Sequence, residues 1–228
     1  MRNLRTTHPR HCRPIHALAV ALLLIVSHLS MNGEDVNTLY MSFLSTDGAE
    51  RAATADAIYL EMYEAQFLDS LMHFNTNEKT DVSEAWLHYW MSEYYYDLEQ
   101  FENALQAALR ANDLSKSIKD PAFMSEVLGT LSNVHFRLGN YDEALKTVLE
   151  AYKIDKQQGN DELISSDLNT IAAIYLAVQQ PEQGITFIEK AIDLERKLDR
   201  QDRLAIRLGM ASELYLLNDD CQKAMSCI

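Results

Sequence analysis

The chain has 228 residues, which is enough for one or two domains. Nearly half of it (47%) is hydrophobic, so it is not a disordered chain, and only 7 glycines and 4 prolines argue against an all-β fold with many turns. A net charge of -14 disfavours nucleic acid and anionic lipid as partners, because both are negatively charged. A cationic or neutral peptide matches this charge better.

A basic stretch followed by a short apolar run opens the chain. Four arginines and no acidic residue precede Glu34, and the apolar run spans about residues 15–29. This pattern is typical of a bacterial secretory signal, and the run is shorter than the roughly 20 residues of a spanning helix. We therefore expect residues 1–31 to be a signal peptide, with an uncleaved N-terminal anchor as the alternative. Both interpretations predict an exported protein, either periplasmic or membrane-anchored with an extracytoplasmic body.

Residues 34–80 form the next segment. Apolar residues at three- and four-residue spacing predict helices over 36–44 and about 49–74. Residues 75–80 are polar and predict a loop. The segment is interpreted as a helical cap or as a degenerate first repeat.

A regular repeat runs through the rest of the chain. A small residue marks it at Ala104, Ala144, Gly184 and Ala224. Nine positions earlier stand Tyr95, His135, Tyr175 and Tyr215, and twelve positions earlier stand Ser92, Ser132, Ala172 and Ser212. Such columns predict pairs of antiparallel helices, A and B, in which small residues allow close approach and the aromatic fills the space between. A single pair cannot bury its apolar face, so we expect the pairs to stack.

The stretch from Leu128 to Leu145, LGTLSNVHFRLGNYDEAL, resembles the tetratricopeptide repeat. The resemblance implies an all-α, right-handed superhelix of stacked antiparallel helix pairs. The expected units are 84–120, 124–160, 164–200 and an incomplete 204–228. The usual repeat has about 34 residues and this one about 40, so we expect the extra length in helix B and the linker after it. His135 departs from the aromatic column and Gly184 from alanine, and the usual proline near the end of helix B is absent.

Turn and capping residues suit these boundaries. Gly139 is expected to end one helix, and Pro181 to lie in the first turn of another. Asp120 before Pro121 predicts an N-cap, and Asp81 with Glu84 resembles a capping box. The chain stops at Ile228 inside the last helix B, so we expect it to be part of a longer protein.

No pattern of residues predicts catalysis. Glu84 and His88 share one helix face, but no third metal ligand is in register, and the pair is interpreted as a solvated face. Neither a phosphate-binding glycine loop nor a nucleophile motif is present. Cys221 and Cys227 are too far apart along a helix to bridge. We predict no enzymatic activity, no cofactor and no metal.

The resemblance implies a protein-binding groove lined by the A helices. The residues at the family's groove positions are Trp86, Tyr89, Glu93, Tyr96, Glu126, Asn133, Phe136, Arg137 and Asn169. Exposed aromatics are effective binding anchors, because they bury a large area with little loss of rotamer entropy. For Trp86 and Tyr89, packing against the 49–74 helix is an equal alternative, and for Trp90 packing is favoured. A chaperone-type carboxylate clamp is incomplete, because Gly129 stands where the family has lysine.

The resulting functional hypothesis is a protein–protein interaction scaffold. We expect an extracytoplasmic sensory or adaptor region that binds a peptide or protein in its concave face. Alternatives are a component of an envelope assembly or nutrient-uptake complex, or the N-terminal part of a longer signalling protein with a downstream kinase or DNA-binding module. Contact with a membrane is expected only through the leader or a downstream segment.

Overall fold

The computed structural model describes residues 38, 41–43, 45–46, 54 and 80–227. The chain divides into two compact units, Met1–Trp90 and Met91–Ile228, and each is described by itself. The expected leader lies outside the described residues, and so does nearly all of the predicted cap. No helix among the residues that the structure describes has both the length and the apolar content needed to cross a membrane.

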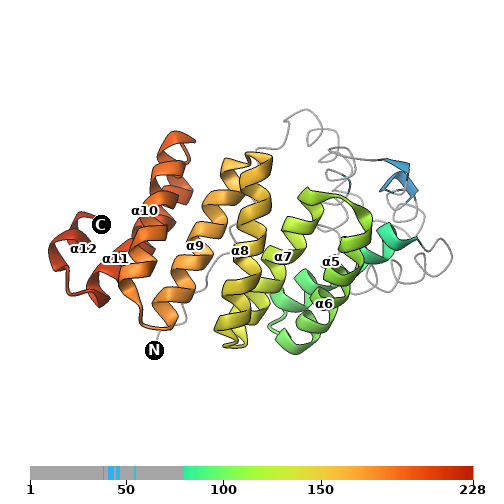
Figure 1. Ribbon diagram of the computed structural model, residues 1–228, viewed down its shortest axis with the longest axis horizontal. Helices are drawn as coiled ribbons and strands as arrows, with labels where there is room; N and C mark the ends of the chain where they lie inside the picture. The colour runs from blue at the N-terminus through green and yellow to red at the C-terminus, as the bar shows by residue number, and fades with distance from the viewer. Residues whose placement is uncertain (1–37, 39–40, 44, 47–53, 55–79, 228) are drawn as a thin grey trace, which may run out of the picture. The chain divides into compact units, whose positions relative to one another are not determined.

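From residue 80 onward, the described helices repeat in pairs, in step with the small-residue column. The A helices are α5 Asp81–Asp97, α7 Pro121–Arg137, α9 Asp161–Ala177 and α11 Gln201–Leu217. The B helices are α6 Phe101–Ile118, α8 Tyr141–Gln158, α10 Pro181–Lys197 and α12 Cys221–Ser226. Figure 1 shows α7 to α11 side by side in chain order, as consecutive packed pairs. The predicted all-α solenoid of helix pairs is confirmed.

The small-residue column lies where the A and B helices of one pair meet. Its four members are each the fourth residue of a B helix, and Ala104 and Ala144 are completely buried. The Ser132 hydroxyl donates to the Ala144 carbonyl at 2.9 Å, and Ser212 donates to Ala224 in the same way at 3.3 Å. The columns therefore occupy equivalent places, as predicted.

Gly184 departs from alanine because α11 approaches α10 closely at this point. A Cβ atom added there would lie 2.5 Å from Leu214 Cδ2 and 3.3 Å from Tyr175 Cβ. Leu214 is completely buried, so moving its side chain aside would disturb the packing around it. The third helix pair therefore has glycine at this position, because the Cβ of an alanine would clash with Leu214 of the fourth pair.

One residue in left-handed conformation follows each helix from α5 to α11. After the A helices these are Glu99, Gly139, Gln179 and Asp219, and after α6, α8 and α10 they are Lys119, Gly159 and Asp199. Behind α9, the Gln180 N–H donates to the Tyr175 carbonyl at 2.8 Å and the Gln179 N–H to Leu176 at 3.1 Å. This is the Schellman pattern, which satisfies the last carbonyls of a helix.

Helix starts agree with the expected chemistry except at one place. The Asp120 carboxylate accepts from the N–H groups of Ala122 and Phe123, and Pro181 occupies the first turn of α10, as predicted. The capping box at α5 was predicted on the wrong pair. Thr80 is the cap: its N–H donates to Ser83 Oγ at 2.9 Å, and the Ser83 N–H donates to Thr80 Oγ1 at 3.0 Å. Asp81 is the first helical residue, where its charge complements the helix dipole.

The A helices have 17 residues each and the B helices α6, α8 and α10 have 17 or 18, so the extra length of the repeat is not confined to helix B. In α8 the helix continues through Lys156 to Gln158, and Gly159 at φ +68° ends it. Proline at Lys156 would remove a backbone donor and break this last turn. Its absence explains why the B helices α6, α8 and α10 run for 17 or 18 residues.

Candidate functional site

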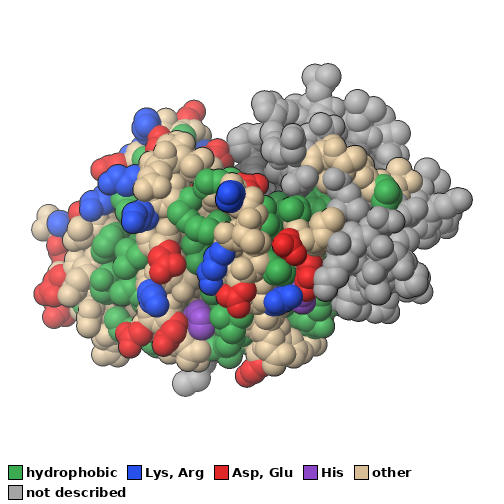
Figure 2. Space-filling view, turned by 45° about the vertical axis from the view of Figure 1, so that its right-hand side comes forward, with side chains coloured by type: hydrophobic (Ala, Val, Ile, Leu, Met, Phe, Trp, Pro, Cys, Tyr) green, Lys and Arg blue, Asp and Glu red, His purple; other side chains and the backbone are tan. Residues whose placement is uncertain are grey.

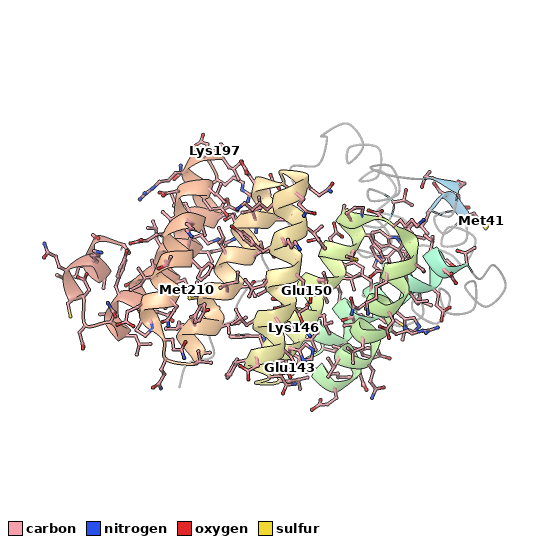
Figure 3. All side chains as sticks on the ribbon, in the orientation of Figure 1. Met41, Glu143, Lys146, Glu150, Lys197 and Met210 are labelled. Atoms are coloured by element: carbon pink, nitrogen blue, oxygen red, sulfur yellow. The ribbon has the colours of Figure 1, made fainter. Side chains whose placement is uncertain are left out.

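The outer side of the B helices is a solvated, mixed-charge surface. On α8, Glu143, Lys146 and Glu150 recur at three- and four-residue spacing and are exposed. Figure 3 shows them in a row along the helix. In Figure 2, acidic and basic side chains alternate over the visible face of the described part. Such a face favours solubility over recognition of a single partner.

The tryptophans of α5 pack rather than project. Trp90 is 1% exposed, and its ring centroid lies 5.1 Å from that of the fully buried Phe43. This confirms packing for Trp90. Trp86 is 6% exposed and contacts Phe43 at 5.6 Å, whereas Tyr89 is half-buried and edge-on to Trp86 at 5.7 Å. A role of Trp86 or Tyr89 in binding stays a prediction.

Glu93 is buried between two A helices. Its side chain leaves α5 and is only 4% exposed. The Thr130 hydroxyl of α7 donates to Glu93 Oε1 at 2.5 Å. The resemblance to the repeat family predicted Glu93 as a groove residue but did not predict Thr130. The available signal is that Thr130 lies three residues before Asn133, the residue that corresponds to Glu93 in the next unit.

An aromatic pair holds Arg137 at the end of α7. Its guanidinium carbon lies 4.5 Å from the Phe101 ring centroid and 5.6 Å from that of Tyr96. The two rings meet edge-on, and Arg137 also pairs loosely with Glu99 at 4.0 Å. Burial raises the pKa of Tyr96, and the positive charge of Arg137 opposes that rise. Stacking on the rings limits the freedom of Arg137 and presents its donors in one orientation.

Two asparagines occupy neighbouring A helices. Asn133 on α7 and Asn169 on α9 are both half-buried. The Asn169 Oδ1 atom is enclosed and has no hydrogen-bond partner in the described part of the chain. Glu126 is half-buried on the same face of α7. Phe136 instead packs at the edge of the core, with its ring 5.7 Å from that of Tyr141.

No metal or proton-transfer centre emerges from the described residues. They contain no group of three or more histidine, cysteine or acidic side chains that could hold an ion. His88 lies 3.9 Å from Glu84 along α5, and Cys221 and Cys227 are free thiols. Burial lowers the pKa of His135, against the opposing field of Glu143. His135 is half-buried, which suits its predicted packing role in the aromatic column.

A buried ionic cluster joins the third helix pair to α11. Glu195 and Arg207 are both completely buried, and Arg207 Nη2 lies 3.4 Å from Glu195 Oε1 without forming a hydrogen bond. Glu195 accepts from Arg200 Nε at 3.0 Å and from Ser165 Oγ at 2.6 Å. Burial lowers the pKa of Arg207 to about 10, although Glu195 opposes this. The apolar and small-residue columns of the sequence do not predict this cluster.

Comparison with known protein families matches one description, tetratricopeptide repeat, over residues 125–158. This range begins within α7 and ends with α8. No curated protein sequence matches the chain.

Solved structures of several proteins share the fold. BtubC (BKLC) from P. vanneervenii has 14% identity and a TM-score of 0.68, over 93% of this chain and 86% of that one. A signal transduction ATPase with a tetratricopeptide repeat sensor, from Pyrococcus horikoshii, has 19% identity and a TM-score of 0.69, over 92% of this chain. A Rap protein in complex with competence and sporulation factor has 16% identity and a TM-score of 0.67, also over 92%. The chain spans 34% of the ATPase and 57% of the Rap protein.

Proposed function

Because the chain belongs to the tetratricopeptide repeat family, we propose that its A helices bind an extended peptide or protein segment. This repeat fold serves as a protein–protein interaction scaffold and is typically non-catalytic. The A-helix face is defined here as the half-buried polar side chains of α7 and α9 together with the last turns of α5. It differs from the outer side of the B helices, which is a solvated charged surface.

The observation that carries the proposal is the unsatisfied amide of Asn169. Its Oδ1 atom is enclosed without a donor among the described residues, although a buried acceptor normally has a partner. A primary amide offers both a donor and an acceptor, so it can pair with the N–H and C=O of a peptide backbone. Asn133, on the preceding A helix, offers the same groups. Two amides on adjacent A helices suit a ligand in extended conformation.

A sensory or adaptor role fits this mode of binding. One structure that shares the fold includes a tetratricopeptide repeat sensor, and another is a Rap protein complexed with competence and sporulation factor. Both likenesses concern the fold alone. The sensory role rests on them as analogy.

The proposed site of action is outside the cytoplasm. The basic and apolar pattern of residues 1–31 supports this. The test fuses residues 1–40 to a reporter enzyme that is active only after export, beside a matched fusion in which Leu22, Leu23 and Leu24 are changed to arginine. We expect reporter activity only with the native leader. Equal activity of both fusions contradicts export through this leader.

The binding proposal is tested with a displayed library of random dodecapeptides, selected on the full chain. Enriched peptides are then measured by fluorescence anisotropy against the Asn133→Ala/Asn169→Ala double variant. Two lost hydrogen bonds at about 1 kcal/mol each predict a loss of affinity of at least tenfold. The control is Asn103→Ala, an exposed asparagine on α6. If all three proteins bind alike, the A-helix face is not the site.

A further inference from the structure

The A helices carry most of the charge imbalance of the array. From Met91 to Ala177 their acidic residues are Glu93, Asp97, Glu126, Asp161, Glu162 and Asp167, and their one basic residue is Arg137. The B helices α6, α8 and α10 have ten acidic and eight basic residues. A ligand on the A-helix face therefore meets a negative field that the outer side lacks.

The two acidic side chains at the start of α9 form ion pairs within the chain. Asp161 pairs with Lys197 at 2.6 Å, and Glu162 pairs with Arg200 at 3.0 Å. Both lie at the start of α9, away from the polar groups of Asn133 and Glu93. They link the start of α9 to the end of α10 and to the residue Arg200 that follows it.

Glu93 is different because it is buried without a cation. In the described part of the chain no ion pair involves Glu93, and Arg137 pairs with Glu99. Its hydrogen bond from Thr130 is a neutral one. Burying a carboxylate is costly unless a positive charge accompanies it. One hydroxyl donor offsets only part of that cost.

We propose that Glu93 is the subsite for a positively charged group of the bound peptide, a lysine or arginine side chain or the amino terminus. This rests on the proposed function, and it adds the chemical class of the ligand. The Thr130 hydroxyl holds one carboxylate oxygen, and the cation contacts the other. Tyr96, one turn further along α5, is half-buried, and its ring is already in contact with Arg137.

The experiment uses the full chain and three octapeptides, two with an acetylated amino terminus and one with a free amino terminus. Acetyl-(Ala-Lys)4-amide supplies side-chain cations, acetyl-(Ala-Gln)4-amide is neutral, and (Ala-Gln)4-amide with a free amino terminus supplies one terminal cation. Affinities are measured by anisotropy at about 0.15 M salt, where unspecific attraction between exposed charges is screened. The variants are Glu93→Gln and, as the matched control, Glu102→Gln, which removes the same charge from an exposed position on α6.

We expect Glu93→Gln to weaken binding of a cationic peptide at least fivefold and to leave the neutral peptide unchanged, whereas Glu102→Gln changes neither. The peptide that responds identifies the source of the cation. Thr130→Val keeps the carboxylate, so the preference for a cation persists in that variant. If Thr130→Val and Glu93→Gln lose the preference alike, or if Glu93→Gln and Glu102→Gln weaken binding equally, the subsite is wrong.

A second measurement reports on the carboxylate itself. In protein with 13C-labelled glutamate, the carboxyl resonance missing from Glu93→Gln belongs to Glu93. It should shift on addition of the cationic peptide, and the Glu102 resonance should not. An unmoved Glu93 resonance overturns the inference. Loss of neutral-peptide binding in the asparagine double variant separately reports the proposed function.

Discussion

Single side chains account for the departures of this array from a uniform repeat. Gly184 stands where the other units have alanine, and the close approach of Leu214 explains the exchange. Alanine there gains about 1 kcal/mol of helix propensity, but overpacking against a buried side chain costs about 1–3 kcal/mol. The difference is a net loss of up to about 2 kcal/mol, so we expect Gly184→Ala to lower the free energy of unfolding, as the midpoint of urea unfolding measures.

The control for this change is Gly209→Ala. Gly209 lies inside α11 with no heavy atom within 4 Å of an added Cβ. Only helix propensity changes, so the substitution should stabilise the chain by about 0.5–1 kcal/mol. If Gly184→Ala and Gly209→Ala both raised the free energy of unfolding, the clash at Gly184 would be contradicted.

In the buried cluster around Glu195, Arg200 donates a hydrogen bond to the carboxylate, whereas Arg207 donates none. Glu195 keeps Arg200 and Ser165 when Arg207 is removed, whereas Arg207 is left with no counter-charge when Glu195 is removed. We expect Arg207→Met to raise the free energy of unfolding by about 1 kcal/mol or more, and Glu195→Gln to lower it by about 3 kcal/mol. Urea unfolding measures both free energies. If Arg207 and Glu195 stabilised the chain as a mutual ion pair, both substitutions would lower the free energy of unfolding, which would contradict this prediction.

The pH dependence of the cluster has a defined sign. Burial lowers the pKa of Arg207 to about 10 in the folded chain, below that of a free arginine side chain. Above about pH 10 the folded chain releases this proton while the unfolded chain still binds it, so the Arg207 contribution to stability rises with pH in that range. Below pH 10 its unfavourable contribution is constant. Arg207→Met should abolish this rise, and a variant with the same alkaline profile as the native chain would refute the assignment.

At the scale of elements, the turns after the A helices share one backbone conformation although different residues occupy it. Gly139 is the one glycine among four equivalent left-handed positions after the A helices, and the others are Glu99, Gln179 and Asp219. A residue with a Cβ loses about 1 kcal/mol in this conformation. Gln179→Gly should therefore stabilise the chain by about 0.5–1 kcal/mol in thermal or urea unfolding, because backbone strain is removed while the capping bonds remain.

The reverse substitution isolates the same effect. At Gly139, φ is +78° and an added Cβ meets no atom within 4 Å. Gly139→Ala tests backbone conformation alone and should destabilise by about 1 kcal/mol. If Gly139→Ala leaves the free energy of unfolding unchanged, the left-handed conformation does not limit which residue can occupy this position.

Much of this architecture follows from local sequence patterns. The small column and the proline and aspartate caps were sufficient to predict the helix pairs, because each depends on contacts within one unit. The capping box of Thr80 and Ser83 was not predicted from the sequence. The next residue, Asp81, is also a common N-cap residue, and together with Glu84 it resembles a capping box as well. The contacts of Glu93 with Thr130 and of Glu195 with Arg207 join different units. No single-unit pattern contains them.

At the scale of the whole molecule, stability should vary along the array. Each helix pair contacts its chain neighbours, so α8 and α9 are supported from both sides, whereas α12 has six residues and packs on α11. Hydrogen exchange followed by mass spectrometry of the full chain should show the slowest exchange in α8 and α9 and the fastest, within the described helices, in α12. Uniform protection from α6 to α12 would indicate one cooperative unit instead.

The candidate site belongs to this larger scale, since it is formed by side chains from successive units. The sequence placed Asn133 and Asn169 on the A helices by resemblance, and the structure adds that one of their amide oxygens lacks a donor in the described part. Which groups are satisfied inside the chain is a property of the packed array. It could not be derived from the spacing of the repeat columns.

The left-handed residue behind each helix from α5 to α11 has a consequence for how such a chain changes during evolution. All of these turns except the one after α6 are closed by backbone bonds to their own preceding helix, so the geometry at such a junction depends on a few adjacent residues. Recombination that duplicates or excises one whole unit joins such a junction to an equivalent one. The number of A helices can therefore grow or shrink by whole units while such a junction keeps its capping bonds.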